Sequence, residues 1–113
     1  MPLYLYRFGY TPEAWAALAR DPSDRRDMLA ARLFGGFGGQ LKGFWYSFGT
    51  ADGYALAELP DNVSAAAVST AVVASGAFRS FETIVLLTVE EMVEAMSRAG
   101  DLGYEAPGGS AER

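Results

Sequence analysis

Apolar and polar residues alternate along four short segments of the chain, which is the pattern of half-buried β-strands. The four segments are rich in Leu, Val, Ile, Tyr and Phe, the residues that pack well on a pleated sheet. They cover residues 3–9, 40–48, 53–59 and 78–88. Only a short turn containing Gly49 and Asp52 separates the second segment from the third. The pattern therefore predicts a central hairpin between residues 40 and 59.

Capping residues and helical spacing predict the elements between these strands. Thr11 supplies an N-cap hydroxyl, and Pro12 suits the first turn of a helix. Pro22 interrupts that helix, because proline removes a backbone hydrogen bond, and a second helix can start there. Thr88 and Glu91 have the spacing of a capping box. The expected helices cover residues 12–19, 22–35, 62–75 and 89–99.

Two of these helices carry apolar and charged residues on different faces. In the helix over residues 22–35, the inward stripe is Met28, Leu29, Leu33 and Phe34, and the solvated face is Arg25, Arg26, Asp27 and Arg32. In the helix over residues 89–99, the expected inward residues are Met92, Val93 and Met96. A glycine-rich segment, residues 35–39, ends the first of these helices. Such a segment can also cradle phosphate, but that use needs a preceding strand and a following helix, the reverse of the order here.

The elements follow the order β-α-β-β-α-β, with one further helix at the end. This order predicts an α+β fold of the ferredoxin-like class with a four-stranded antiparallel sheet. The length of 113 residues fits a single domain, expected over residues 1–99, with a flexible tail over residues 100–113. Helices on one side of such a sheet leave its other side open.

The open side of this sheet is expected to be apolar. Strict alternation places Lys42 and Glu58 there, where they can pair across the hairpin. The apolar residues expected on the same side are Leu3, Leu5, Phe44, Tyr46, Tyr54, Leu56, Ile84 and Leu86. Such a patch is larger than soluble monomers usually expose, and a twofold mate can cover it. The sequence therefore predicts a homodimer or a higher homo-oligomer.

Composition and charge restrict the possible chemistry. The chain has no cysteine and no histidine, which excludes disulfides, thiol catalysis, Ser-His-Asp triads and most transition-metal sites. We therefore expect no cofactor and no metal. The net charge of −5 and the thinly spread Lys and Arg argue against nucleic acid and anionic membranes as partners. The chain shows no transmembrane run and no signal peptide, so we expect a cytoplasmic protein.

Several short motifs of this chain resemble one known family. They are Tyr10-Thr11, Asp21-Pro22, Arg25 with Ala30-Ala31-Arg32, Gly39-Gln40-Leu41-Lys42-Gly43-Phe44-Trp45, Gly49-Thr50-Ala51-Asp52 and Ala57-Glu58-Leu59-Pro60-Asp61. Together they resemble the GYD domain family of small bacterial proteins, over residues 3–96. The resemblance implies a ferredoxin-like domain that associates through its sheets as a dimeric α/β barrel. It implies little about activity, because the function of the family is largely uncharacterised and a fold alone does not supply one.

The turn between the two central strands departs from the family pattern. The family usually has Gly-x-Tyr-Asp there, whereas this chain has Ala51 in place of the tyrosine. A tyrosine follows the acid instead, at Tyr54. A role of the family tyrosine therefore cannot be transferred to Ala51.

Two sets of residues are candidates for a functional site. The catalytic candidates are Asp52, Glu82 and Tyr54, because carboxylates and tyrosines can do acid–base work without histidine. The ligand-binding candidates are Arg7, Lys42, Tyr46, Phe48, Tyr54 and Glu58. Each also has a structural interpretation: Asp52 can bond to turn amides, Arg7 can pair with Glu82, and the aromatic residues can fill a core or an interface. For Asp52 to act as a base, burial among aromatic side chains has to raise its pKa.

Two functions from different classes remain open. One is a homo-oligomeric module that binds a small apolar or aromatic molecule, or only itself. The other is a cofactor-free enzyme, similar to small dimeric-barrel monooxygenases and isomerases, that acts on an aromatic or polyketide-like compound. An enclosed cavity lined by a desolvated carboxylate favours the enzyme, whereas a barrel filled by side chains favours the module.

Overall fold

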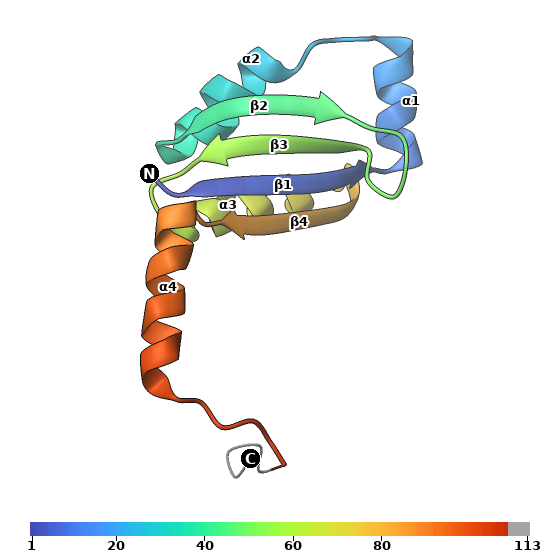
Figure 1. Cartoon of the computed structure of the whole chain (residues 1–113). Helices are drawn as coiled ribbons and strands as arrows, with labels where there is room; N and C mark the ends of the chain where they lie inside the picture. Colours follow the sequence, from blue (N-terminus) through green and yellow to red (C-terminus); the bar gives the residue numbers. More distant parts are fainter. Residues whose placement is uncertain (109–113) are drawn as a thin grey trace.

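The computed structural model describes residues 1–108, and its centre is a four-stranded antiparallel sheet with the strand order β2-β3-β1-β4 (Figure 1). The strands are β1 (Leu3–Tyr10), β2 (Gln40–Tyr46), β3 (Gly53–Glu58) and β4 (Phe78–Leu86). The helices are α1 (Pro12–Arg20), α2 (Arg26–Met28), α3 (Asn62–Ala74) and α4 (Val89–Leu102). A π-helix (Leu29–Phe34) and a 3-10 helix (Gly35–Phe37) follow α2 directly. The expected α+β class and four-stranded antiparallel sheet are confirmed.

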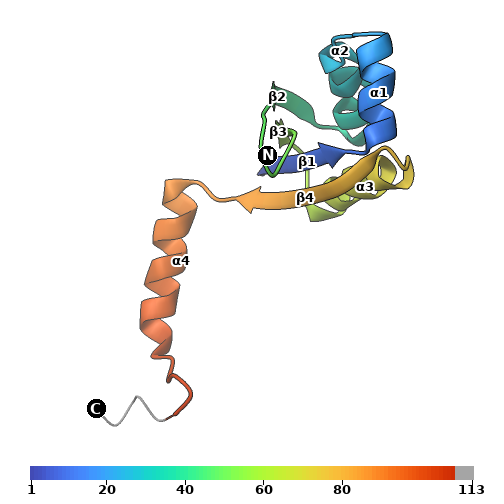
Figure 2. The same cartoon turned by 90° about the vertical axis from the view of Figure 1, so that its right-hand side faces the viewer.

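Helices α1, α2 and α3 lie on one side of the sheet, here called the covered side, and leave the open side free (Figure 2). Alternate residues of β1 point into the covered side, where the core forms. Tyr4 donates a hydrogen bond of 2.7 Å to Asn62, and Tyr6 donates one of 3.0 Å to the carbonyl of Ala65. These bonds to α3 satisfy phenol groups that the core removes from water. The buried core residues are Tyr4, Tyr6, Phe34, Ala55, Ala57, Leu59, Ala65 and Val68.

The helix expected over residues 22–35 begins later than the sequence indicates. Residues 22–25 are not helical, and α2 starts at Arg26. Asp24 fixes this start, because its carboxylate accepts the backbone N–H of Arg26 at 3.0 Å and also binds the Arg26 guanidinium. The rest of the expected helix becomes the π-helix and the 3-10 helix, which end at Gly38 with φ 78°. Glycine adopts this left-handed conformation at little energetic cost.

A bulge in β2 changes which side of the sheet its aromatic residues occupy. The register against β3 shifts around Lys42, which is an extra residue in the strand. One extra residue moves every later side chain to the opposite side of a sheet. Phe44 is paired with Ala55 on the covered side, and Tyr46 lies on the same side, whereas Trp45 faces the open side. The expectation that Phe44 and Tyr46 lie on the open side is therefore wrong.

The open side combines apolar residues with two ion pairs between strands. Arg7 and Glu82 are opposite each other in register, with 3.6 Å between guanidinium and carboxylate. Lys42 lies 3.9 Å from the Glu58 carboxylate, so both pairs anticipated from the sequence are present. The apolar residues of this side are Leu3, Leu5, Trp45, Tyr54, Leu56, Ile84 and Leu86. All of them are half-buried or exposed in the chain.

Helix α4 extends away from the sheet, on the open side and beyond the edge formed by β4 (Figures 1 and 2). The predicted capping box of Thr88 and Glu91 is confirmed at its start. None of its residues is buried, so the expectation that Met92, Val93 and Met96 point into the domain is wrong. The helix continues to Leu102, which shortens the expected tail, and the part of that tail after residue 108 lies outside the described residues.

In the described part of the chain, no helix combines the length and apolar character needed to cross a membrane.

Candidate functional site

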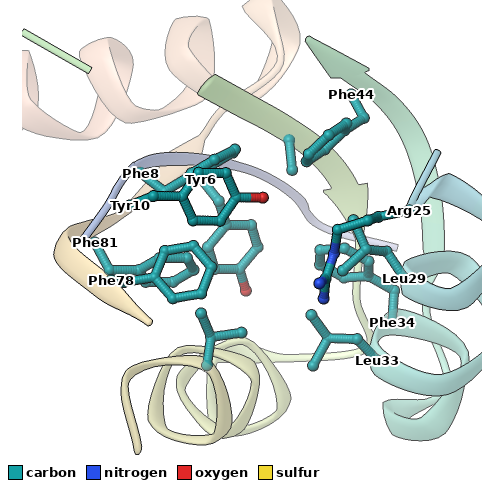
Figure 3. A pocket seen from close by; sticks show the side chains of 12 residues that line it. Tyr6, Phe8, Tyr10, Arg25, Leu29, Leu33, Phe34, Phe44, Phe78 and Phe81 are labelled. Carbon is teal, nitrogen blue, oxygen red and sulfur yellow. The ribbon is translucent and has the colours of Figure 1, made fainter. Parts of the chain in front are cut away.

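A narrow cavity lies on the covered side, between the sheet and the segment that contains α2 and the π-helix (Figure 3). Its volume is about 40 Å³, which leaves room for a few water molecules at most. Aromatic residues of the sheet form one wall, and Arg25, Leu29 and Leu33 face them from the other side. The lining residues are Tyr6, Phe8, Tyr10, Arg25, Leu29, Leu33, Phe34, Phe44, Ala55, Val72, Phe78 and Phe81.

An open groove of about 560 Å³ adjoins this cavity. Arg25 and Phe44 line both spaces, so these two side chains stand between the inner cavity and the groove. The other residues of the groove are Pro22, Ser23, Asp24, Arg26 and Tyr46. An apolar inner space joined to a polar, partly charged outer one is typical of sites for small molecules.

The aromatic wall depends on close packing between neighbouring strands. Phe8 stacks on Phe44 with 5.6 Å between ring centroids, and Tyr10 lies 5.0 Å from Phe78. A Cβ atom at Gly53 would lie 2.3 Å from the Phe8 ring, so this glycine leaves the space that the ring occupies. Offset and edge-to-face ring pairs of this kind contribute beyond their buried area.

The opposite wall is formed by the π-helix. The backbone N–H of Gly35 bonds to the carbonyl of Ala30, five residues earlier, which is the π-helical pattern. A Cβ atom at Gly35 would lie only 2.7 Å from that carbonyl oxygen, so the wide turn depends on glycine. The turn directs Leu29 and Leu33 toward the cavity. Short π-helical segments often occur at functional sites, which gives this cavity priority over the other hollows of the chain.

Arg25 is the one charged residue in the cavity lining. Its half-buried side chain directs the guanidinium into the cavity (Figure 3). Asp24, the nearest acid in sequence, is bound by the guanidinium of Arg26 at 2.7 Å, and Arg25 has no ion-pair partner among residues 1–108. The sequence pattern predicted Arg25 on the solvated face of a helix. This prediction is wrong, because α2 begins at Arg26 and Arg25 precedes it. A late helix start is difficult to anticipate from composition or spacing.

Tyr10 lines the cavity together with this arginine, and Tyr46 lines the adjoining groove with it. Burial raises the pKa of Tyr10 well above its ordinary value, and a hydrogen bond with Tyr46 raises it further. The nearby Arg25 charge acts in the opposite direction and is outweighed. Tyr10 therefore remains a neutral phenol near neutral pH, able to donate or accept a hydrogen bond but not to act as a base. Tyr46, a predicted ligand-binding residue, lies in the groove at the entrance to the cavity.

A sequence model of the GYD domain matches residues 4–96, from β1 into α4. The chain belongs to the GYD domain family. The match confirms the resemblance carried by the central hairpin. No curated protein and no solved structure matches the chain.

In this GYD domain, the acid of the family turn, Asp52, connects β1, α1 and β4. The Asp52 carboxylate accepts the backbone N–H of Tyr10 at 2.9 Å and the indole N–H of Trp15 at 3.1 Å, and it lies 3.2 Å from the Arg79 guanidinium. Burial alone would raise its pKa, but these donors outweigh burial and hold the pKa below its ordinary value. The shift is opposite to the one that a general base requires. The family tyrosine position, Ala51, is buried and apolar.

The remaining candidates of the GYD domain are not gathered at the cavity. Five of them lie on the open side of the sheet: Arg7, Lys42, Tyr54, Glu58 and Glu82. Phe48 is fully exposed in the turn between β2 and β3. Of the predicted ligand-binding residues, Tyr46 alone is near the cavity. The sequence pattern did not identify Arg25 and Tyr10 as site residues. In the described residues, no cluster of three or more Asp or Glu side chains could hold a metal ion.

Proposed function

We propose that this GYD domain protein binds a small aromatic molecule that carries an acidic group, in the cavity between the sheet and the π-helix. The observation that carries the proposal is the unpaired guanidinium of Arg25, aimed into a cavity with an aromatic wall. An aromatic ring matches the wall through ring contacts, and a carboxylate matches the guanidinium through charge-assisted hydrogen bonds. The hydroxyl groups of Tyr10 and Tyr46 can orient the acidic group through hydrogen bonds.

Electrostatics explains why an acid is favoured over a neutral molecule. A partly desolvated cation without an anionic partner is unfavourable, and a bound carboxylate relieves that penalty. The empty cavity, about 40 Å³, is too small for an aromatic ring, so binding requires movement. Arg25 can turn into the adjoining groove, and Leu29 and Leu33 can shift with the π-helix. The bound form is then a conformation that the ligand selects and stabilises.

Calorimetric titration with 2-naphthoate and with its neutral analogue 2-naphthylmethanol tests this function. We expect the wild type to prefer the acid, and Arg25→Gln to weaken 2-naphthoate binding about tenfold, as expected for one lost charge-assisted bond. Binding of the neutral analogue should not change. Arg20→Gln removes the same charge from the exposed end of α1 and serves as the matched control. Equal affinity for both probes, no binding of either, or an unchanged Arg25→Gln variant would contradict the proposal.

The alternative function, a cofactor-free enzyme with Asp52, Glu82 or Tyr54 as catalytic groups, has less support. The Asp52 carboxylate is engaged by three donors and is not part of the cavity lining. Glu82 and Tyr54 lie on the opposite side of the sheet from the cavity. A binding role therefore agrees better with the geometry than an acid–base role.

We further infer that the domain has ferredoxin-like connectivity and forms a homodimer through its open side, as in a dimeric α/β barrel. The strand order, with β1 between β3 and β4, supports this connectivity. The apolar residues of the open side support a partner of the same kind, because a twofold mate presents the same surface. Sedimentation equilibrium tests it: Leu56→Glu should weaken the dimer, whereas Val63→Glu, at an exposed position of α3, should not. A wild-type monomer at micromolar concentration would contradict it.

A further inference from the structure

Helix α4 exposes an apolar stripe that no other element of residues 1–108 covers. Its members recur at helical spacing on one face: Val89, Met92, Val93 and Met96. Their exposed fractions are 76%, 44%, 56% and 56%. The opposite face is polar, and Glu94 and Arg98 form an ion pair one turn apart there. An isolated helix of this length is marginal in water, so α4 requires packing of its apolar face to be stable.

The accessible surface of the chain is larger than that of a compact monomer of the same mass. The accessible area is 7657 Å² for a chain of 12.1 kDa, about 1,600 Å² more than a folded monomer of this mass exposes. The radius of gyration is 18.6 Å, against about 13 Å for a compact domain of this length. A stable protein interface buries about 800 Å² on each partner. The excess is therefore sufficient for one such interface and a contact of the arm in addition.

We propose that α4 is an arm that packs its apolar stripe onto a second copy of the chain, the same copy that covers the open side of the sheet. The arm lies on the open side, beyond the β4 edge, so one partner molecule can contact both surfaces (Figures 1 and 2). Each protomer then contributes an open side and an arm, as a twofold interface requires. This inference rests on the proposed homodimer and adds a second contact to it.

Two other occupants fit the structure less well. The sheet of the same chain is one, but only Leu87 and Thr88 separate β4 from α4, and the helix extends away from the domain (Figure 2). A lipid surface is the other. The polar face of α4 carries four acids and one base, Glu90, Glu91, Glu94, Asp101 and Arg98. Helices that lie on anionic membranes carry Lys and Arg on that face instead.

Val93→Glu tests the arm against a matched control, Ala95→Glu. Val93 belongs to the stripe, whereas Ala95 lies nearly opposite on the same helix, so both variants add one charge to one exposed helix. By sedimentation equilibrium we expect Val93→Glu to weaken the dimer about tenfold or more, from the loss of one buried valine contact. Ala95→Glu should keep the wild-type dissociation constant within about twofold. Circular dichroism checks that α4 remains helical in both variants.

Photo-crosslinking identifies the occupant directly. The chain has no cysteine, so Val93→Cys carries a maleimide–benzophenone label at a single position. A crosslinked product of twice the chain mass is expected. The absence of any product of twice the chain mass overturns the proposal, and an internal crosslink located by peptide mapping would place α4 on its own domain. If the wild type is a monomer, both the proposed homodimer and the proposed contact of the arm are contradicted. If the wild type is a dimer that Val93→Glu does not weaken, and no covalent dimer forms, only the contact of the arm is contradicted.

Discussion

Asp52 and Arg79 join two strands that do not touch each other. The Asp52 carboxylate precedes β3, the Arg79 guanidinium belongs to β4, and they lie 3.2 Å apart although β1 separates these strands. Gly9 makes this possible, because a Cβ atom there would lie 2.6 Å from the Arg79 guanidinium carbon. The Asp52 carboxylate therefore holds the strands together at the end of the sheet where the Tyr10 side chain lines the aromatic cavity.

Asp52→Asn should lower the free energy of unfolding by about 1–2 kcal/mol at neutral pH, because several donors lose a charged acceptor. The pKa of Asp52 is lowered in the folded chain, so its contribution is present above its unfolded pKa and is lost as the pH falls through the folded value. The difference in the free energy of unfolding between the wild type and Asp52→Asn, here called the gap, should therefore narrow as the pH falls below about 4. Urea unfolding at several pH values measures this gap.

The control for this experiment is Asp101→Asn, which removes an acid from exposed α4. We expect this variant to unfold like the wild type over the same pH range. A gap for Asp52→Asn that widens toward acid pH would mean that the carboxylate is destabilised by burial, as a catalytic base would be.

Gly35→Ala should destabilise the domain by about 1–3 kcal/mol, the usual range for overpacking. A methyl group at this position meets the carbonyl oxygen of Ala30 at 2.7 Å, so the π-helix has to deform. The next residue provides the control, because a Cβ atom at Gly36 has no neighbour within 4 Å. Gly36→Ala should be neutral or slightly stabilising, since it restricts the unfolded chain. Equal unfolding midpoints for the two variants would contradict the role assigned to Gly35.

Local signals in the sequence predicted much of the fold. Thr11 and Thr88 were recognised as caps, and both accept the expected backbone N–H groups. The four strands followed from alternation and from their residue types. These features could be predicted because each is decided by residues only a few positions apart.

The cavity could not be predicted in the same way. Its location depends on the bulge at Lys42, which moves Phe44 from the open side to the covered side, and alternation does not reveal one extra residue. It also depends on Arg25 preceding α2 rather than lying on it, which the contact between Asp24 and Arg26 decides. Both features result from competition between local hydrogen bonds and packing against the sheet, and that competition is settled only in the folded chain.

The buried tyrosines of β1 should make the domain less stable in alkaline solution. Burial is the main reason that the pKa of Tyr6 is raised to about 12, and it also raises the pKa values of Tyr4 and Tyr10. The stability that these neutral phenols confer is complete below about pH 10, the unfolded pKa, and is lost as the pH rises toward the folded values. Urea midpoints should therefore fall between about pH 10 and about pH 12. Tyr6→Phe should make the decline shallower, and Tyr104→Phe, which removes an exposed phenol, serves as the control. A decline that is identical in the two variants would show that another process causes the alkaline loss of stability.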